Sequence, residues 1–276
     1  MIATFLMRAA ILNDMLTLDA PVPERQRTAS EFISENVRKD PKTRDAATAE
    51  TLLQGHVPDL LRTFVPLTID FKDKLGLSHR LELNVLYDYL MIGVDEDQLH
   101  APMSPLKAQL VADAWSCVLP TTKLVDLIWQ NARIKVAPQP WGPPYDATMM
   151  SMQRISAHDE RVDKSILSKG FDASTALEAV LIAGHKKDVV ITNQLAARPK
   201  QVAIFGWHQT NGKPIQPLYL GHENTYYDYS HSVRLISKRC TLDGIEDDLT
   251  RIMQDPVLHV AVSNEGQMKL TRQPLI

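Results

Sequence analysis

The apolar positions in the first half of the chain recur at the spacing of amphipathic helices. Ser104 and Pro105 are typical of a helix start, and the apolar residues that follow them fall on one helical face. A second stripe of the same kind begins near Thr121. The pattern also predicts a helix over 47–54 and another after Pro58. We therefore expect this half to be mostly helical.

Strand patterns are sparse in the first half and dominate the second. Strict alternation of apolar and polar residues over 81–85 predicts one half-buried strand, which continues towards Ile92. Over 188–243, short apolar runs alternate with Gly, Asn and Pro turns, and Asn211–Gly212 is a strong hairpin signal. The predicted fold class is α+β: a helical N-terminal half with one or two strands, followed by a mainly antiparallel β-sheet in the C-terminal half.

Shifts in composition divide the chain into three segments. Residues 1–46 are expected to form an N-terminal helix and a loosely held polar arm, because their second part is charged and contains prolines. Residues 47–140 are predicted to form a mostly helical lobe, and residues 141–276 an antiparallel sheet lobe that carries a final helix near 245–254. The proline-rich stretch 136–150 is the expected boundary. One continuous domain across that boundary is the alternative.

Charge and hydropathy exclude several function classes. With 44% hydrophobic and 23% charged residues, the chain has the composition of a folded globular protein. Its formal net charge is −3 and it has no basic stripe, so we expect no nucleic-acid partner. No apolar stretch approaches the roughly 20 residues that span a bilayer, and the N-terminus lacks the features of a secretory signal. Cytoplasmic localisation is therefore expected, with secretion as the open alternative.

Histidine and tyrosine are concentrated in one part of the second half. Four of the nine histidines fall within 185–231, and four of the seven tyrosines fall within 219–229. Histidine titrates near neutral pH, so a pocket lined with it can transfer protons under physiological conditions. Such rings are also common as structural residues on half-buried sheets. The candidate substrate-binding residues are His185, Lys187, Trp207, His208, Tyr226, Tyr229 and Arg234.

The leading hypothesis is a cysteine hydrolase. Cys117 lies just before a predicted helix, where the positive end of the helix dipole lowers the pKa of a thiol and favours a thiolate nucleophile. His222 or His231 would serve as the base, and Asp228 as the carboxylate that orients it. The expected reaction is hydrolysis of an amide or related bond in a peptide or glycopeptide such as cell-wall material, without a cofactor. A buried, unreactive thiol is the alternative at Cys117.

The order of a helix-borne cysteine followed by a sheet-borne histidine is similar to that of papain-like amidases of the NlpC type. The segments GHKKDVVIT and QVAIFGWHQTNGKPIQ resemble successive strands of that family. The resemblance covers Cys117–His231 and implies the amidase activity stated above. Family members typically open the second strand with the catalytic histidine, where this chain has Gln201. His222 or His231 would therefore have to take its place.

A metal-dependent hydrolase is the second hypothesis. His208, His222 and His231 would hold zinc, with a water molecule in the fourth position. The segment HQTNGKPIQ over 208–216 resembles the HxxxGxxxD pattern of zinc D,D-peptidases, with Gln216 where that pattern has a ligating carboxylate. A third hypothesis is a non-catalytic protein whose Tyr/His surface binds a glycan or another subunit. The expected ligand is accordingly a peptide, a glycopeptide or a glycan.

Overall fold

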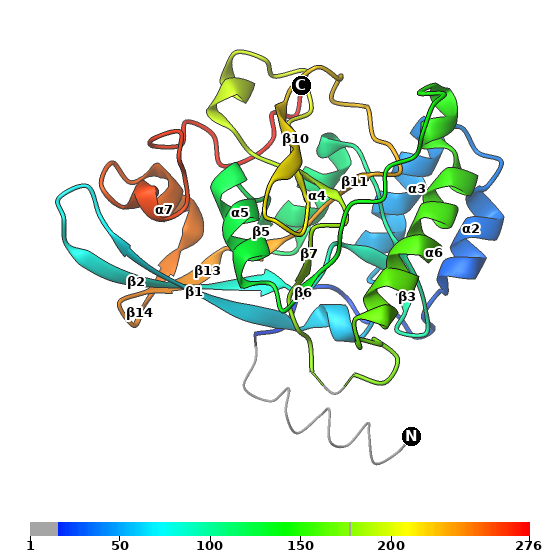
Figure 1. Cartoon of the computed structure of the whole chain (residues 1–276), viewed down its shortest axis with the longest axis horizontal. Coiled ribbons are helices and arrows are strands. Elements are labelled where there is room, and N and C mark those ends of the chain that lie inside the picture. The colour runs from blue at the N-terminus through cyan, green and yellow to red at the C-terminus, as the bar shows by residue number, and fades with distance from the viewer. Residues whose placement is uncertain (1–15, 177) are drawn as a thin grey trace.

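The computed structural model describes residues 16–176 and 178–276 and has an α+β fold (Figure 1). This confirms the predicted fold class, because most of the described helices lie in the first half and most antiparallel pairings involve the second. The helices are α2 (Ala29–Asn36), α3 (Pro41–Leu53), α4 (Pro105–Ala114), α5 (Thr122–Asn131), α6 (Met152–Ser168) and α7 (Leu249–Gln254). Among the described residues, no helix has both the length and the apolar character needed to cross a bilayer.

The largest sheet combines strands from both halves of the chain. Its order is β14-β13-β2-β12-β5, β1 pairs with β2, and every pairing is antiparallel. Leu81 and Leu83 of β2 are buried and Glu82 is exposed, as the predicted alternation requires. The segments 47–140 and 141–276 therefore share a sheet. Its strands are β1 (Phe64–Lys72), β2 (Ser78–Leu86), β5 (Cys117–Val118), β12 (Ile236–Ser237), β13 (Arg239–Leu242) and β14 (Ile245–Asp248).

A second sheet has the order β10-β9-β8-β11 and lies entirely in the second half. Strands β8, β9 and β10 pair antiparallel, as predicted, whereas β11 runs parallel to β8. The predicted hairpin joins β9 to β10, and its turn has Gly212 at φ 88° and a hydrogen bond from the amide of Gln209 to the carbonyl of Lys213. The strands are β8 (Lys187–Val189), β9 (Ile204–His208), β10 (Pro214–Tyr219) and β11 (His231–Ser232).

Two short strand pairs complete the architecture and place the site described below. One is the hairpin β3–β4, and the other is the parallel pair β6–β7. Figure 1 shows α2, α3 and α6 gathered at one end of the molecule, with α7 and the long β1–β2 hairpin at the other. The strands are β3 (Met91–Val94), β4 (Asp97–His100), β6 (Ile134–Lys135) and β7 (Ile182–Ala183). Short 3-10 turns are η2 (Leu60–Arg62), η3 (Ala147–Met150), η4 (Asn193–Ala196) and η5 (Leu258–Ala261).

The polar arm predicted within 1–46 is wrong in its second part, which forms α2 and the start of α3. Thr28 and Glu31 form a reciprocal capping box at the start of α2, and the Asp40 side chain caps α3. These caps stabilise helices whose faces are too polar to give an apolar stripe. The predicted N-terminal helix falls mainly on residues 1–15, outside the described part of the chain.

Two further helix predictions need correction. The helix expected after Pro58 is only the short turn η2, because Phe64 already begins β1. Residues 245–248 form β14, so the final helix begins at Leu249. By contrast, the helices predicted from Ser104 and Thr121 are confirmed as α4 and α5. Ser104 caps α4 as expected, and Thr121 caps α5.

Candidate functional site

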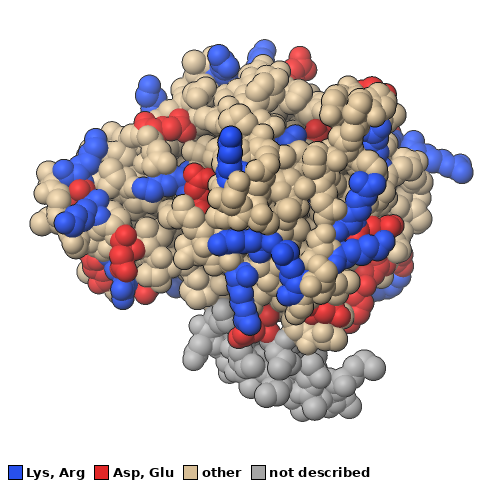
Figure 2. Space-filling model, in the orientation of Figure 1, with Lys and Arg blue, Asp and Glu red and all other residues tan. Residues whose placement is uncertain are grey.

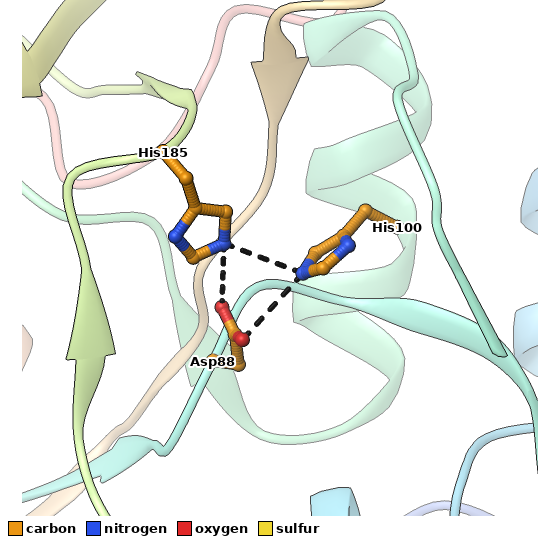
Figure 3. Close-up of side chains that lie close together, drawn as sticks. All are labelled: Asp88, His100 and His185. Carbon is orange, nitrogen blue, oxygen red and sulfur yellow. Dashed lines mark hydrogen bonds and ion pairs between the residues drawn. The ribbon is translucent and has the colours of Figure 1, made fainter. Parts of the chain in front are cut away.

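Three buried polar side chains from distant segments meet in the interior (Figure 3). Asp88 lies in the bend that follows β2, His100 is the last residue of β4, and His185 lies between β7 and β8. The Nε2 of His185 is 3.1 Å from Asp88 Oδ1 and 3.3 Å from the Nε2 of His100. The Nε2 of His100 is 3.5 Å from Asp88 Oδ2. We refer to Asp88, His100 and His185 as the triad cluster.

Backbone hydrogen bonds hold the three segments together. The amide of Ile182 in β7 donates to the carbonyl of Tyr87 at 2.8 Å, and this bond joins the end of β2 to the strand before His185. The amide of Ala101 donates to the carbonyl of Leu90, which closes the β3–β4 hairpin against the same bend. The amide of Tyr89 donates to Asp88 Oδ1 at 2.7 Å and fixes the orientation of that carboxylate.

A second carboxylate orients His100 from the other side. Asp159, in the middle of α6, accepts from Nδ1 of His100 at 2.6 Å and from the backbone amide of His100 at 3.2 Å. Asp159 is 3% exposed, so these bonds form in a medium of low polarity. Holding Nδ1 in this way directs Nε2 towards Asp88. Histidines that bind metal ions usually have such a carboxylate on the other ring nitrogen.

The two imidazoles of the triad cluster have opposite protonation preferences. Burial alone would lower the pKa of His100, but the carboxylates of Asp159 and Asp88 raise it to about 10. Burial lowers the pKa of His185 to about 4, although Asp88 opposes this. Burial would raise the pKa of Asp88, but the two imidazoles beside it lower that pKa. His100 is therefore a buried cation between two carboxylates at neutral pH.

The spacing within the triad cluster fits a tetrahedral metal ion. Zinc binds imidazole nitrogen and carboxylate oxygen at about 2.0–2.2 Å, which sets the edges of its tetrahedron at about 3.3–3.6 Å. The Nε2 atoms of His100 and His185 are 3.3 Å apart, which is close to such an edge. Each lies 3.1–3.5 Å from a different oxygen of Asp88, His185 from Oδ1 and His100 from Oδ2. Within residues 16–176 and 178–276, two groups can offer one ligand atom per residue with all of these atoms within 4.8 Å of one another: the triad cluster, and His100 with Asp159 and Asp163.

Buried cations surround the triad cluster. The Nζ of Lys186 lies 3.1 Å from Nδ1 of His158 and donates to the carbonyl of Tyr229 at 3.0 Å. Burial lowers the pKa of Lys186. The guanidinium of Arg234 lies 3.8 Å from Asp88 and donates to two backbone carbonyls. These groups limit the uncompensated negative charge that the carboxylates would otherwise bring into the interior.

A cavity of about 320 Å³ borders the triad cluster at Asp88. Asp88 and Asp159 lie in its wall beside Asp163, and the aromatic rings of Tyr87 and Phe171 line it as well. Burial raises the pKa of Asp163 to about 7, and the nearby Asp159 adds to this effect. The cavity could admit a small ligand or one end of a larger one.

The candidate substrate-binding residues predicted from the sequence do not all lie together in the structure. His185 belongs to the triad cluster, and Tyr229 and Arg234 adjoin it. Trp207 also adjoins it, because its Nε1 donates to the carbonyl of His185 at 2.9 Å, and the Nζ of Lys187 lies over the Trp207 ring at 4.9 Å. His208 points to a different partner: its Nε2 donates a hydrogen bond to Asp126 Oδ1 at 2.8 Å, and its ring stacks on that of Trp129.

A second group forms around Tyr226. Its ring stacks on His222 with the ring centres 4.0 Å apart, and its hydroxyl donates to Asp228 at 3.2 Å. The Nε2 of His231 is 3.9 Å from Asp228. Thus three of the predicted catalytic residues, His222, His231 and Asp228, do lie together. His222 and Tyr226 line a groove of about 1050 Å³. His208, His222 and His231 do not form a ligand group within the described residues.

Cys117 lies in a different environment from the one expected. It belongs to β5, is 1% exposed, and donates from Sγ to the carbonyl of Trp115 at 3.1 Å. Burial raises the pKa of the Cys117 thiol, whereas the predicted helix dipole effect would have lowered it. This environment favours the neutral thiol. The cysteine hydrolase therefore stays a prediction without support from the geometry.

Sequence reasoning missed Asp88, His100 and Asp159. The available signal was local: Asp88 is the one charged residue within the apolar stretch LNVLYDYLMIGV. A charged residue inside such a stretch is buried with a partner or serves a function. Comparison of the chain with protein-family models, with curated proteins and with solved structures found no match. The function must therefore be inferred from the geometry of the site.

Proposed function

We propose that the protein is a metal-dependent hydrolase whose divalent cation, zinc or a similar ion, is bound by the triad cluster. The observation that carries this proposal is the convergence of Asp88, His100 and His185, which can each offer one ligand atom within 4.8 Å of the others, with Asp159 bound to the far nitrogen of His100. Two histidines and one carboxylate are a common ligand set of catalytic zinc.

Three protein ligands would leave one position of a four-coordinate metal ion for water. Asp88, His100 and His185 would hold the metal ion, which would supply a Lewis acid that lowers the pKa of water to near neutrality and activates it for hydrolysis. Asp159 keeps His100 in the orientation that binding requires. The cavity lies on the side of Asp88 and provides the place where a scissile bond would be held. An amide of a peptide or glycopeptide, as the sequence suggested, is one bond of this class.

Metal content is the direct test. The purified protein without an affinity tag is dialysed against zinc, washed with metal-free buffer and analysed for bound metal. We expect about one ion per chain for the wild type and a loss of at least tenfold in affinity for His185→Ala. The matched control is His208→Ala, because His208 is equally buried and bonded to an aspartate but lies outside the triad cluster.

The control also separates this proposal from the metal site that the sequence suggested. Loss of metal in His208→Ala with retention in His185→Ala would refute the triad cluster as the ligand set. Absence of bound metal in the wild type, with a correctly folded protein, would refute the proposed function altogether. Thermal unfolding followed by circular dichroism checks that each variant is folded.

A further inference from the structure

The cavity beside the triad cluster is strongly acidic. Eight of its twenty lining residues are acidic, six aspartates and two glutamates, and none of the described lining residues is Lys or Arg. Three basic groups lie behind this wall: His100 is bonded to Asp159 at 2.6 Å, and Lys186 and Arg234 lie 3.9 and 3.8 Å from Asp159 and Asp88. Figure 2 shows acidic side chains, with Lys and Arg side chains among them, at the lower right of the molecule, where α6 and β3 lie in Figure 1. Because the eight acidic lining residues outnumber these three basic groups, the wall favours a positively charged ligand.

Unsatisfied hydrogen-bond acceptors provide a second, independent observation. Oδ1 of Asp163 and Oε1 of Gln98 are both buried and both lack a hydrogen-bond partner, and both residues line this cavity. A buried acceptor without a donor costs about 1–3 kcal/mol, more when it is charged. A ligand that brings N–H donors into the cavity would remove this cost. A negatively charged or purely accepting ligand would increase it.

The rest of the wall suits a carbon chain. The rings of Tyr87 and Phe171 lie 5.9 Å apart, and both line the cavity with the aliphatic side chains of Ile33, Leu99 and Ile166. Aromatic faces attract ammonium and guanidinium groups as well as apolar carbon. The wall thus offers acceptors for a cationic group and an apolar surface for the chain that carries it.

From the acidic wall, the two unsatisfied acceptors and the aromatic lining, we propose that this cavity binds the cationic end of the substrate, an ammonium or guanidinium group on a short carbon chain. The inference rests on the proposed function only in calling this ligand a substrate. Asp88 of the triad cluster lines the cavity, as does Asp159, which is bonded to His100, so the cationic end would lie next to the bond that is hydrolysed.

Calorimetric titration with agmatine tests the inference, because agmatine carries an ammonium and a guanidinium group on one short chain. The titration is run at low ionic strength and pH about 8, where the Asp163 carboxyl, with a pKa of about 7, is ionised. The reference ligand is 1-butanol, which has the same four-carbon chain and no cationic group. We expect agmatine to bind one to one and the reference ligand to bind at least tenfold more weakly.

Two variants and one control locate the binding. Asp163→Asn and Glu160→Gln each remove a charge from the lining of the cavity, and each should weaken agmatine binding about tenfold or more. Glu160 is exposed on α6, so its replacement keeps the test valid if Asp163→Asn fails to fold. Asp70→Asn removes the same charge from an exposed position on β1 and should change the affinity less than twofold.

The outcomes separate this inference from the proposed function. Wild-type protein that binds zinc but not agmatine would overturn the inference and leave the metal site standing. Agmatine binding without metal binding would support the cationic site while the proposed function fails. Equal weakening in Asp70→Asn and Asp163→Asn would show attraction to net charge alone and would also overturn the inference.

Discussion

Metal binding at the triad cluster should release about one proton per ion at about pH 6, below the pKa of about 7 of a zinc-bound water. In the metal-free protein His100 is a cation: Nδ1 is bonded to Asp159, Nε2 faces Asp88, and the pKa is about 10. A metal ion can bind Nε2 only after displacing its proton. His185, with a pKa of about 4, is already neutral, so its single proton moves to Nδ1 and is not lost. Among the protein ligands only His100 therefore contributes to the release, and the count of one proton applies below the pKa of the metal-bound water.

The displacement of this proton determines how the apparent metal affinity depends on pH. The proton competes with the metal at every pH below the folded pKa of His100, so the apparent affinity must rise as pH rises. One displaced proton gives a tenfold change in affinity per pH unit, which is about 1.4 kcal/mol. Between about pH 6 and pH 8 the affinity should thus increase at least about a hundredfold, because ionisation of the metal-bound water adds to the displacement of the His100 proton. The increase should stop near pH 10, where His100 loses the proton by itself.

Calorimetry in buffers of different ionisation enthalpy measures the proton count directly. The apparent binding enthalpy is plotted against the buffer enthalpy, and the slope should be about one proton released. His208→Ala should give the same slope, because His208 lies outside the triad cluster. A slope of zero together with an affinity that is constant from about pH 6 to pH 8 would show that His100 is not a ligand.

Three further predictions test the surroundings of the site. Asp159→Asn should weaken metal binding about 10–100-fold by equilibrium dialysis, since it removes the carboxylate that orients His100; unchanged affinity would contradict that role. Cys117 and Cys240 are both buried and should react with a thiol reagent only after unfolding, whereas fast native labelling of Cys117 would restore the cysteine mechanism. Tyr89→Phe should lower the free energy of unfolding in urea by about 1–3 kcal/mol, because it removes a buried hydrogen bond of 2.9 Å to Asp188; no change would mean that this bond adds nothing.

Local signals explain which parts of the fold were predictable. Helices α4 and α5 begin at Ser104 and Thr121 because each cap is formed by a side chain that bonds an amide three residues later. The β9–β10 hairpin depends on Gly212, whose positive φ is equally local. The helices in the polar arm were missed because their stability comes from the Thr28 and Asp40 caps and from packing, not from an apolar stripe.

The candidate site was only partly predictable because it depends on long-range contacts. His185 was identified from the density of histidines near it, but its partners come from the β2 bend and β4, nearly a hundred positions away. The density of histidines and tyrosines along the chain instead pointed to His222 and Tyr226, which are neighbours in both sequence and space. A buried site that combines single polar residues from distant segments leaves no cluster in the sequence. Asp88 was visible only as a charge within an apolar stretch.

The shared sheet also determines the order in which the chain can fold. Thr241 of β13 pairs with Glu82 of β2 across 159 positions, so one edge of β2 has no partner until almost the whole chain has left the ribosome. During synthesis one edge of the β1–β2 hairpin therefore has unpaired backbone groups, and these can pair with the same edge of another nascent chain. Contacts of such long range fold slowly. We therefore expect refolding yield to fall as protein concentration rises, and a fragment that ends before β12 to aggregate.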